Sequence, residues 1–161
     1  RQMCIRDRYK SFCNSKELQK EYTLVIAGKG RFLMPQNEYN SNIVFINRYI
    51  KDTEVGYLFK KASAVVYPYI SATQSGVLSI SCFFNTPTLT SDIPYFKSII
   101  DSSGIAITFN KNDTNDLTQQ LLKLLNSSTD EMKEKQQQFY KSFYSENSIR
   151  IMLKEIYVQL K

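Results

Sequence analysis

The sequence predicts an α/β domain built on a doubly wound parallel sheet, with a Rossmann-like, three-layer α/β/α architecture. Short β-branched segments alternate with longer amphipathic segments along the whole chain, which is the pattern of repeated βα units. Such units bring each strand back parallel to the one before it. Small polar and glycine-containing loops follow several of the strands, at the edge where open α/β sheets bind their ligands.

The length and composition describe one ordinary domain. The chain has 161 residues, enough to bury a core without disulfides. Its three cysteines show no metal-ligand spacing, and it contains no histidine, so the commonest general base and the commonest zinc ligand are both absent. We find no apolar run of about 18 to 20 residues and no signal peptide. We therefore expect a soluble protein with free thiols.

The charge is positive but dispersed. There are 21 Lys and Arg against 15 Asp and Glu, a net charge of +6. Such a charge suits nucleic acid, an anionic membrane face or a phosphorylated ligand. Because the basic residues are not gathered in one tract, solvated helix faces account for most of them, and no nucleic-acid partner is expected.

Residues 1–8 fit none of the patterns that follow. We interpret Arg-Gln-Met-Cys-Ile-Arg-Asp-Arg as a non-native leader of the kind that a translated sequencing adapter leaves. The domain is then residues 9–161.

Five strands and seven helices are expected. The first two strands are predicted to be fully buried because they are almost continuously apolar, and Asp52 is expected to cap the helix after the second. The predicted strands are residues 22–27, 42–47, 64–67, 88–90 and 105–109. The predicted helices are residues 9–20, 53–62, 95–100, 113–126, 129–144, one that opens on Ser75-Gly76 and a last one that Ser145 caps.

The stretch from 64 to 87 organises the chain. It reads as a β-branched strand, a small polar loop and a helix that opens on Ser75-Gly76. Such a loop presents unpaired backbone N–H groups and the positive end of a helix dipole to an anion, and phosphate is the expected ligand. The alternative is that Ser75 is only a helix N-cap and Gly76 only a turn residue.

Several segments, taken in order, resemble glycosyltransferase family 4, the retaining nucleotide-sugar enzymes of the GT-B fold. The resemblance covers roughly residues 10–160, the C-terminal donor-binding half, and a subset of the family has Gln-Ser-Gly in the loop, as this chain does. Segments that carry it are Tyr67-Pro68, Gln74-Ser75-Gly76-Val77, Asn85-Thr86-Pro87-Thr88-Leu89, Ser91-Asp92-Ile93-Pro94 and the run 101–113.

The resemblance implies a donor-binding site made of three loops. The first loop also suggests close backbone approach to a ligand on its own, because Gly28-Lys29-Gly30 closes an apolar strand. Lys29, Arg31 and Arg48 are the candidate cations for the diphosphate. Tyr49 and Tyr69 are the candidate aromatic rings for contact with the base. For Tyr49, core packing is an equal alternative. For each of the basic residues, the alternative is a solvated surface charge with no role in ligand binding. The expected donor-binding residues are Gly28, Lys29, Gly30, Asn47, Arg48, Tyr49, Thr73, Gln74, Ser75, Gly76 and Val77.

The same resemblance implies an activity and its partners. The parent enzyme is expected to transfer a hexosyl group with retention, without a metal or cofactor, from a nucleoside-diphosphate sugar. Its acceptor would be a cell-surface polysaccharide or lipid-linked glycan, held by an N-terminal domain outside this chain, so the chain alone is expected to be inactive. We expect it in the cytoplasm, with peripheral contact at the inner face of the cytoplasmic membrane. No catalytic residue is assigned.

Two family features are not found. Many members carry a pair of glutamates around the loop helix, but the matching positions lie near Ala72 and Ile80. The family's diphosphate-holding Arg and Lys would lie upstream of Tyr9.

Three other classes of function stay open, one of them nucleic-acid binding through the +6 charge, which would show as a basic stripe in the structure and a steep salt dependence. Another sugar-nucleotide enzyme, such as an epimerase or an inverting transferase, would place a histidine or a carboxylate in the cleft. A non-enzymatic flavodoxin-like or receiver module would cluster acidic residues at the strand ends, and Asp52, Asp92 and Asp101 are not placed at the ends of the first strands.

Overall fold

The computed structural model describes residues 9–30, 41–72 and 76–151. Residues 9–14 and 146–151 are helical as well. The strands are β1 (Leu24–Ala27), β2 (Ile43–Ile46), β3 (Val65–Tyr67), β4 (Thr88–Ser91) and β5 (Ile107–Phe109). The other helices are α2 (Lys16–Glu21), α3 (Asp52–Lys61), α4 (Val77–Phe84), α5 (Pro94–Ser103), α6 (Thr114–Asn126) and α7 (Asp130–Phe143).

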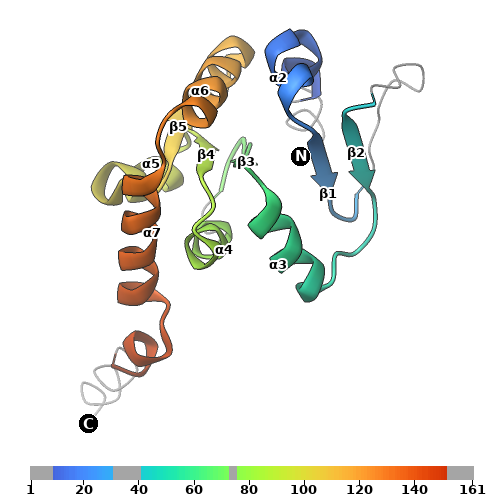
Figure 1. The fold of residues 1–161 in the computed structure, drawn as a ribbon. Coiled ribbons are helices and arrows are strands. Elements are labelled where there is room, and N and C mark those ends of the chain that lie inside the picture. Colours follow the sequence, from blue (N-terminus) through green and yellow to red (C-terminus); the bar gives the residue numbers. More distant parts are fainter. Residues whose placement is uncertain (1–8, 31–40, 73–75, 152–161) are drawn as a thin grey trace.

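The strands are parallel and form two ladders. β1 pairs with β2, and β3, β4 and β5 pair in that order (Figure 1). The prediction of parallel βα units is confirmed. The continuous sheet expected from the sequence is divided between β1 and β3 in the described residues.

Helices cover both faces of the larger ladder. On one face, Tyr67 of β3 packs with Leu78 of α4 and with Phe96 of α5. On the other, Leu89 of β4 and Phe109 of β5 pack with residues of α6. Because successive strand residues point to opposite faces, the two cores lie on either side of one sheet. The expected three-layer, Rossmann-like α/β/α arrangement is thereby confirmed.

The middle strand β4 is the most deeply buried strand, although its sequence is Thr-Leu-Thr-Ser. All four residues are buried. Hydrogen bonds satisfy two of the hydroxyls, because Ser91 donates to the Tyr69 carbonyl at 2.6 Å and Thr88 to the Thr86 carbonyl at 2.7 Å. Polar side chains are tolerated at this depth when they are bonded in this way.

The prediction that the first two strands are fully buried is wrong. Val25 of β1 is 42% exposed and Val44 of β2 is 43% exposed. Their ladder has only two strands in the described residues, so parts of its surface lie open. An apolar run shows which residues prefer burial, but not whether a neighbouring layer covers them.

The helix after β2 begins one residue earlier than predicted. Lys51, not Asp52, occupies the cap position of α3, and Asp52 is its first residue. The carboxylate of Glu54 accepts the Lys51 backbone N–H at 2.9 Å, which satisfies a donor at the helix start. Ser145 does cap the last helix as predicted, because its hydroxyl accepts the Ser148 N–H at 3.2 Å.

Within residues 9–30, 41–72 and 76–151, no helix combines the length and the apolar character that crossing a membrane requires.

Candidate functional site

The first group of predicted site residues lies at the carboxyl ends of β1 and β2. Gly28 has a φ of +137°, a backbone conformation that side chains rarely adopt. The Gly30 N–H donates to Asn47 Oδ1 at 3.1 Å and ties the two loops together. A Cβ atom at Gly28 or Gly30 would meet nothing within 4 Å. The loop is therefore held in place beside open space.

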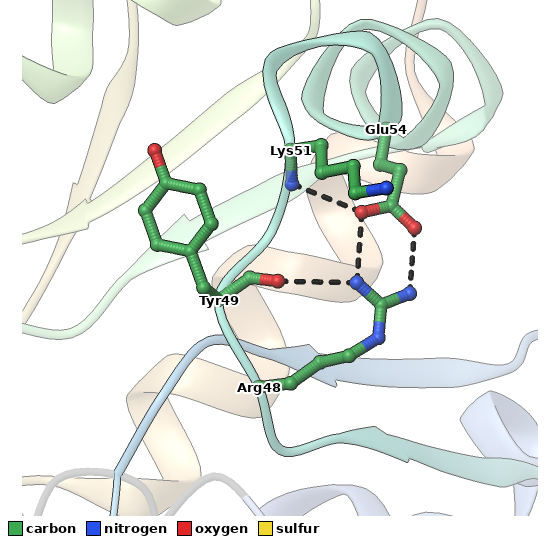
Figure 2. A network of polar contacts seen from close by, with 4 residues as sticks. All are labelled: Arg48, Tyr49, Lys51 and Glu54. Atoms are coloured by element: carbon green, nitrogen blue, oxygen red, sulfur yellow. Dashed lines mark hydrogen bonds and ion pairs between the residues drawn. The ribbon is translucent and has the colours of Figure 1, made fainter.

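Arg48 is engaged within the protein. Its guanidinium forms a two-pronged ion pair with Glu54, at 2.6 and 2.8 Å, and also donates to the Tyr49 carbonyl at 3.1 Å (Figure 2). The pair raises the pKa of Arg48 and lowers the pKa of Glu54 to about 2. A phosphate would have to share Arg48 with this carboxylate, so Arg48 first serves to position the loop between β2 and α3.

Tyr49 presents an open aromatic face. Its side chain is 72% exposed, and its ring points away from the Arg48–Glu54 pair in Figure 2. Core packing, the alternative for this residue, is excluded. An exposed ring held beside an ordered loop can stack on a flat ligand such as a nucleobase.

The second group lies at the start of α4. Gly76 occupies its cap position with a φ of −78°, and a Cβ atom there would also meet nothing within 4 Å. The Tyr67 hydroxyl donates to the Val77 carbonyl at 3.0 Å and contacts the Ser81 hydroxyl at 2.8 Å. This clamp fixes the helix start to the end of β3. The predicted residues Thr73, Gln74 and Ser75 lie outside the described residues, as does Arg31.

The prediction of Tyr69 as a flat ligand face is not supported. Its ring packs edge-on against the fully buried Phe96, with 5.4 Å between the centroids. The half-buried ring thereby packs against the core under α5. Lys29, by contrast, is exposed beside Gly28 and Gly30.

The structure thus brings the site residues together in two groups. Gly28, Gly30, Asn47 and Arg48 are linked by the loops of β1 and β2, and Gly76 and Val77 stand at the end of β3, on the other ladder. Sequence reasoning missed Glu54 as the partner of Arg48. The signal for it was present, because a glutamate at the third position of a helix commonly reaches back to the helix start.

A pocket of about 430 Å³ lies at the opposite edge of the larger ladder. It is lined by residues that precede β3 and β4, among them Ser63, Asn85 and Thr86, with Lys60 and Lys133 at its wall. Ligands of open α/β sheets bind at the carboxyl ends of the strands, so this pocket is not part of the predicted site.

Comparison with known proteins places the chain in a family. The model of the family "Glycosyl transferases group 1" matches residues 9–127. A solved structure, the N-terminal domain of trehalose-6-phosphate phosphatase from Candida albicans, is similar in fold with a TM-score of 0.62 and 12% identity. The match covers 84% of this chain and 33% of that one, so the chain spans about a third of its length. No curated protein matches significantly by sequence. On the family match over residues 9–127, this chain belongs to the glycosyl transferases group 1.

Proposed function

We propose that the chain is the donor-binding half of a retaining family 4 glycosyltransferase of the Gln-Ser-Gly subset. The observation that carries this proposal is the family match over residues 9–127, which spans all three loops expected to bind the donor. Glycines that border open space stand in two of these loops, at Gly28, Gly30 and Gly76. Such positions let a ligand approach the backbone closely.

The proposed donor is a nucleoside-diphosphate sugar. Tyr49 stacks on the base, because its ring is exposed and lies beside the carboxyl end of β2. The backbone around Gly28 and Gly76 approaches the diphosphate, with Lys29 supplying positive charge. Arg48 and Asn47 hold the loops in place through Glu54 and Gly30.

The proposed reaction is transfer of a hexosyl group with retention, without a metal or cofactor. The acceptor is a cell-surface polysaccharide or a lipid-linked glycan, which a further domain of a longer protein holds. Peripheral contact at the inner face of the cytoplasmic membrane fits such an acceptor.

Calorimetry with UDP, GDP, ADP and their glucose, mannose and galactose derivatives tests the donor site. We expect one diphosphate to bind selectively. Tyr49→Ala should weaken it about 5- to 150-fold, because stacking of a base on an aromatic ring contributes about 1–3 kcal/mol. Tyr57→Ala is the matched control, since Tyr57 is also exposed, at 64%, but lies on α3.

A second variant separates binding from folding. Gly76→Val should abolish binding and leave the free energy of unfolding nearly unchanged, because Gly76 has an ordinary φ and open space at its Cβ position. If the folded domain binds none of these ligands at millimolar concentration, or if both variants bind like the parent, the proposed donor site is wrong.

A further inference from the structure

We infer that the pocket at the amino ends of β3 and β4 binds a small organic phosphate, which is an anionic group carried on an apolar body. The pocket has a volume of about 430 Å³, within the range of about 300–1,000 Å³ that is usual for small-molecule sites. It lies at the edge of the larger ladder opposite to Gly76 and the end of β3. This second site is therefore separate from the proposed donor site and does not require it.

Four helix ends supply the lining of the pocket. Residues at the ends of α3, α4 and α6 and at the start of α7 contribute to it. The rings of Phe59 and Phe84 pack against each other there, with 5.5 Å between their centroids. Leu124 and Leu125 of α6 add further apolar surface. Such a lining suits the apolar part of a ligand, with a few polar groups to orient it.

The charged residues of the pocket are all basic. Lys60 and Lys133 line it, and none of its lining residues is Asp or Glu. Within residues 9–30, 41–72 and 76–151, the ion pairs are formed by other side chains, and neither lysine takes part in one. Two unpaired ammonium groups at one pocket favour an anion. A phosphate, which carries up to two negative charges, matches both.

Lys133 occupies a position that the helix itself does not favour. It is the fourth residue of α7, near the positive end of the helix dipole. The acidic side chains beside it are engaged elsewhere, since Asp130 accepts the Ser128 hydroxyl at 3.0 Å and Glu131 pairs with Lys135 at 2.6 Å. A bound anion would offset the unfavourable position of the Lys133 charge.

Asn85 contributes an amide that is open to a ligand. It follows the last residue of α4 and lines the pocket. Its Oδ1 is buried and finds no hydrogen-bond partner in the described part of the chain, whereas buried polar atoms are normally bonded. Because the terminal torsion of an asparagine is broad, the amide can turn either its nitrogen toward a phosphate oxygen or its oxygen toward a ligand hydroxyl.

Phenyl phosphate is the probe, because it joins a phosphate to one aromatic ring. Two-dimensional amide NMR of the chain follows titrations with phenyl phosphate, inorganic phosphate and phenol. We expect phenyl phosphate to shift the amides of Ser63, Asn85 and Ser127 saturably in the millimolar range. Inorganic phosphate and phenol should each bind at least about tenfold more weakly, because each fills only part of the pocket. Shifts that do not saturate, or that scatter over the whole surface, would overturn the assignment.

Charge variants test the two lysines. Lys60→Ala and Lys133→Ala should each weaken phenyl phosphate binding at least about threefold, because each removes a cation that contacts the phosphate. Lys61→Ala and Lys141→Ala are the matched controls. They remove the same charge from the same two helices, at exposed residues that do not line the pocket. If all four variants weaken binding equally, the probe responds to the overall surface charge and the pocket is not its site.

Two further variants test the location. Ser63 is exposed and lines the pocket, so Ser63→Trp can fill the space without disturbing the core, and it should weaken phenyl phosphate binding at least about tenfold. Tyr49→Ala, in the candidate donor site, should leave this binding unchanged, because distant sites act independently. The amide spectrum of each variant shows that it is folded. Unchanged binding by folded Ser63→Trp, or a loss with Tyr49→Ala, would contradict the site.

Discussion

At the scale of single residues, the ion pair of Arg48 and Glu54 is the most defined polar feature of the candidate site. It holds the chain between β2 and α3 with three hydrogen bonds, two from Arg48 and one from the Lys51 backbone. The carboxylate thus organises the loop from which Tyr49 extends (Figure 2). We expect Glu54 to affect ligand binding only through the position of that loop.

The pH dependence of stability should report this pair. The pKa of Glu54 is about 2 in the folded protein and about 4.3 in an unfolded chain. A lowered carboxyl pKa stabilises the fold above the unfolded value, and this contribution is lost as the pH falls from about 4.3 to about 2. Glu54→Gln should therefore flatten the decline in the free energy of unfolding over this interval. Glu134→Gln is the control, because it removes the same charge from an exposed glutamate. An identical effect of both variants would contradict the prediction.

Gln136 is the residue whose role the sequence least suggests. It belongs to a helix rich in Lys, Glu and Gln, yet it is fully buried. Its amide donates to the carbonyls of Thr86 and Ile105, each at 2.9 Å, and thereby joins α7 to the segments that lead into β4 and β5.

Replacing Gln136 by leucine should destabilise the protein. The substitution leaves two buried carbonyls without this donor, which costs about 1–3 kcal/mol. Urea unfolding measures the loss. Gln137→Leu is the control, because Gln137 is the next residue in the chain and its side chain is exposed. Equal free energies of unfolding for the two variants would show that the Gln136 bonds do not contribute.

At the scale of elements, the helices differ in how their first turns are satisfied. The Asp113 carboxylate accepts the N–H groups of Asn115 and Asp116 at the start of α6. Thr129, in the cap position of α7, makes no such side-chain bond. The two positions form a matched pair for testing the contribution of a cap.

Asp113→Ala should lower the free energy of unfolding by about 0.5–2 kcal/mol, the usual contribution of a bonded N-cap. Thr129→Ala should change it by no more than a few tenths of a kcal/mol, because it removes no side-chain cap bond. Chemical unfolding of both variants measures the difference. A larger loss for Thr129→Ala would contradict this assignment.

At the scale of the whole molecule, burial is concentrated in the larger ladder and its helices. Leu89 and Phe96, on the two faces of that ladder, are both fully buried. The ladder of β1 and β2 has exposed apolar residues on both strands. Stability should therefore be distributed unevenly between the two parts.

Leu89→Ala should cost about 2–5 kcal/mol, because it leaves a cavity in a closed core. Val44→Ala should cost less than about 1 kcal/mol, because Val44 is 43% exposed already. Thermal and urea unfolding of the two variants provide the comparison. A loss for Val44→Ala as large as that for Leu89→Ala would show that the smaller ladder is more tightly packed than its exposure indicates.

The sequence by itself determined the local features of this protein. Alternating β-branched and amphipathic segments specified parallel strands and helices, and Asp113 and Ser145 marked helix starts, because capping and periodicity depend on residues close together in the chain. It also placed glycines after β1 and before α4, where the structure has open space at their Cβ positions.

Only the tertiary structure decided which faces and edges meet. It exposed Tyr49, packed Tyr69 on Phe96 and buried Gln136, and it divided the strands into two ladders. Apolar runs such as residues 22–27 and 42–47 carry the same composition whether or not a neighbouring strand covers them. Burial depends on contacts between segments far apart in the chain, and those contacts have no local signature.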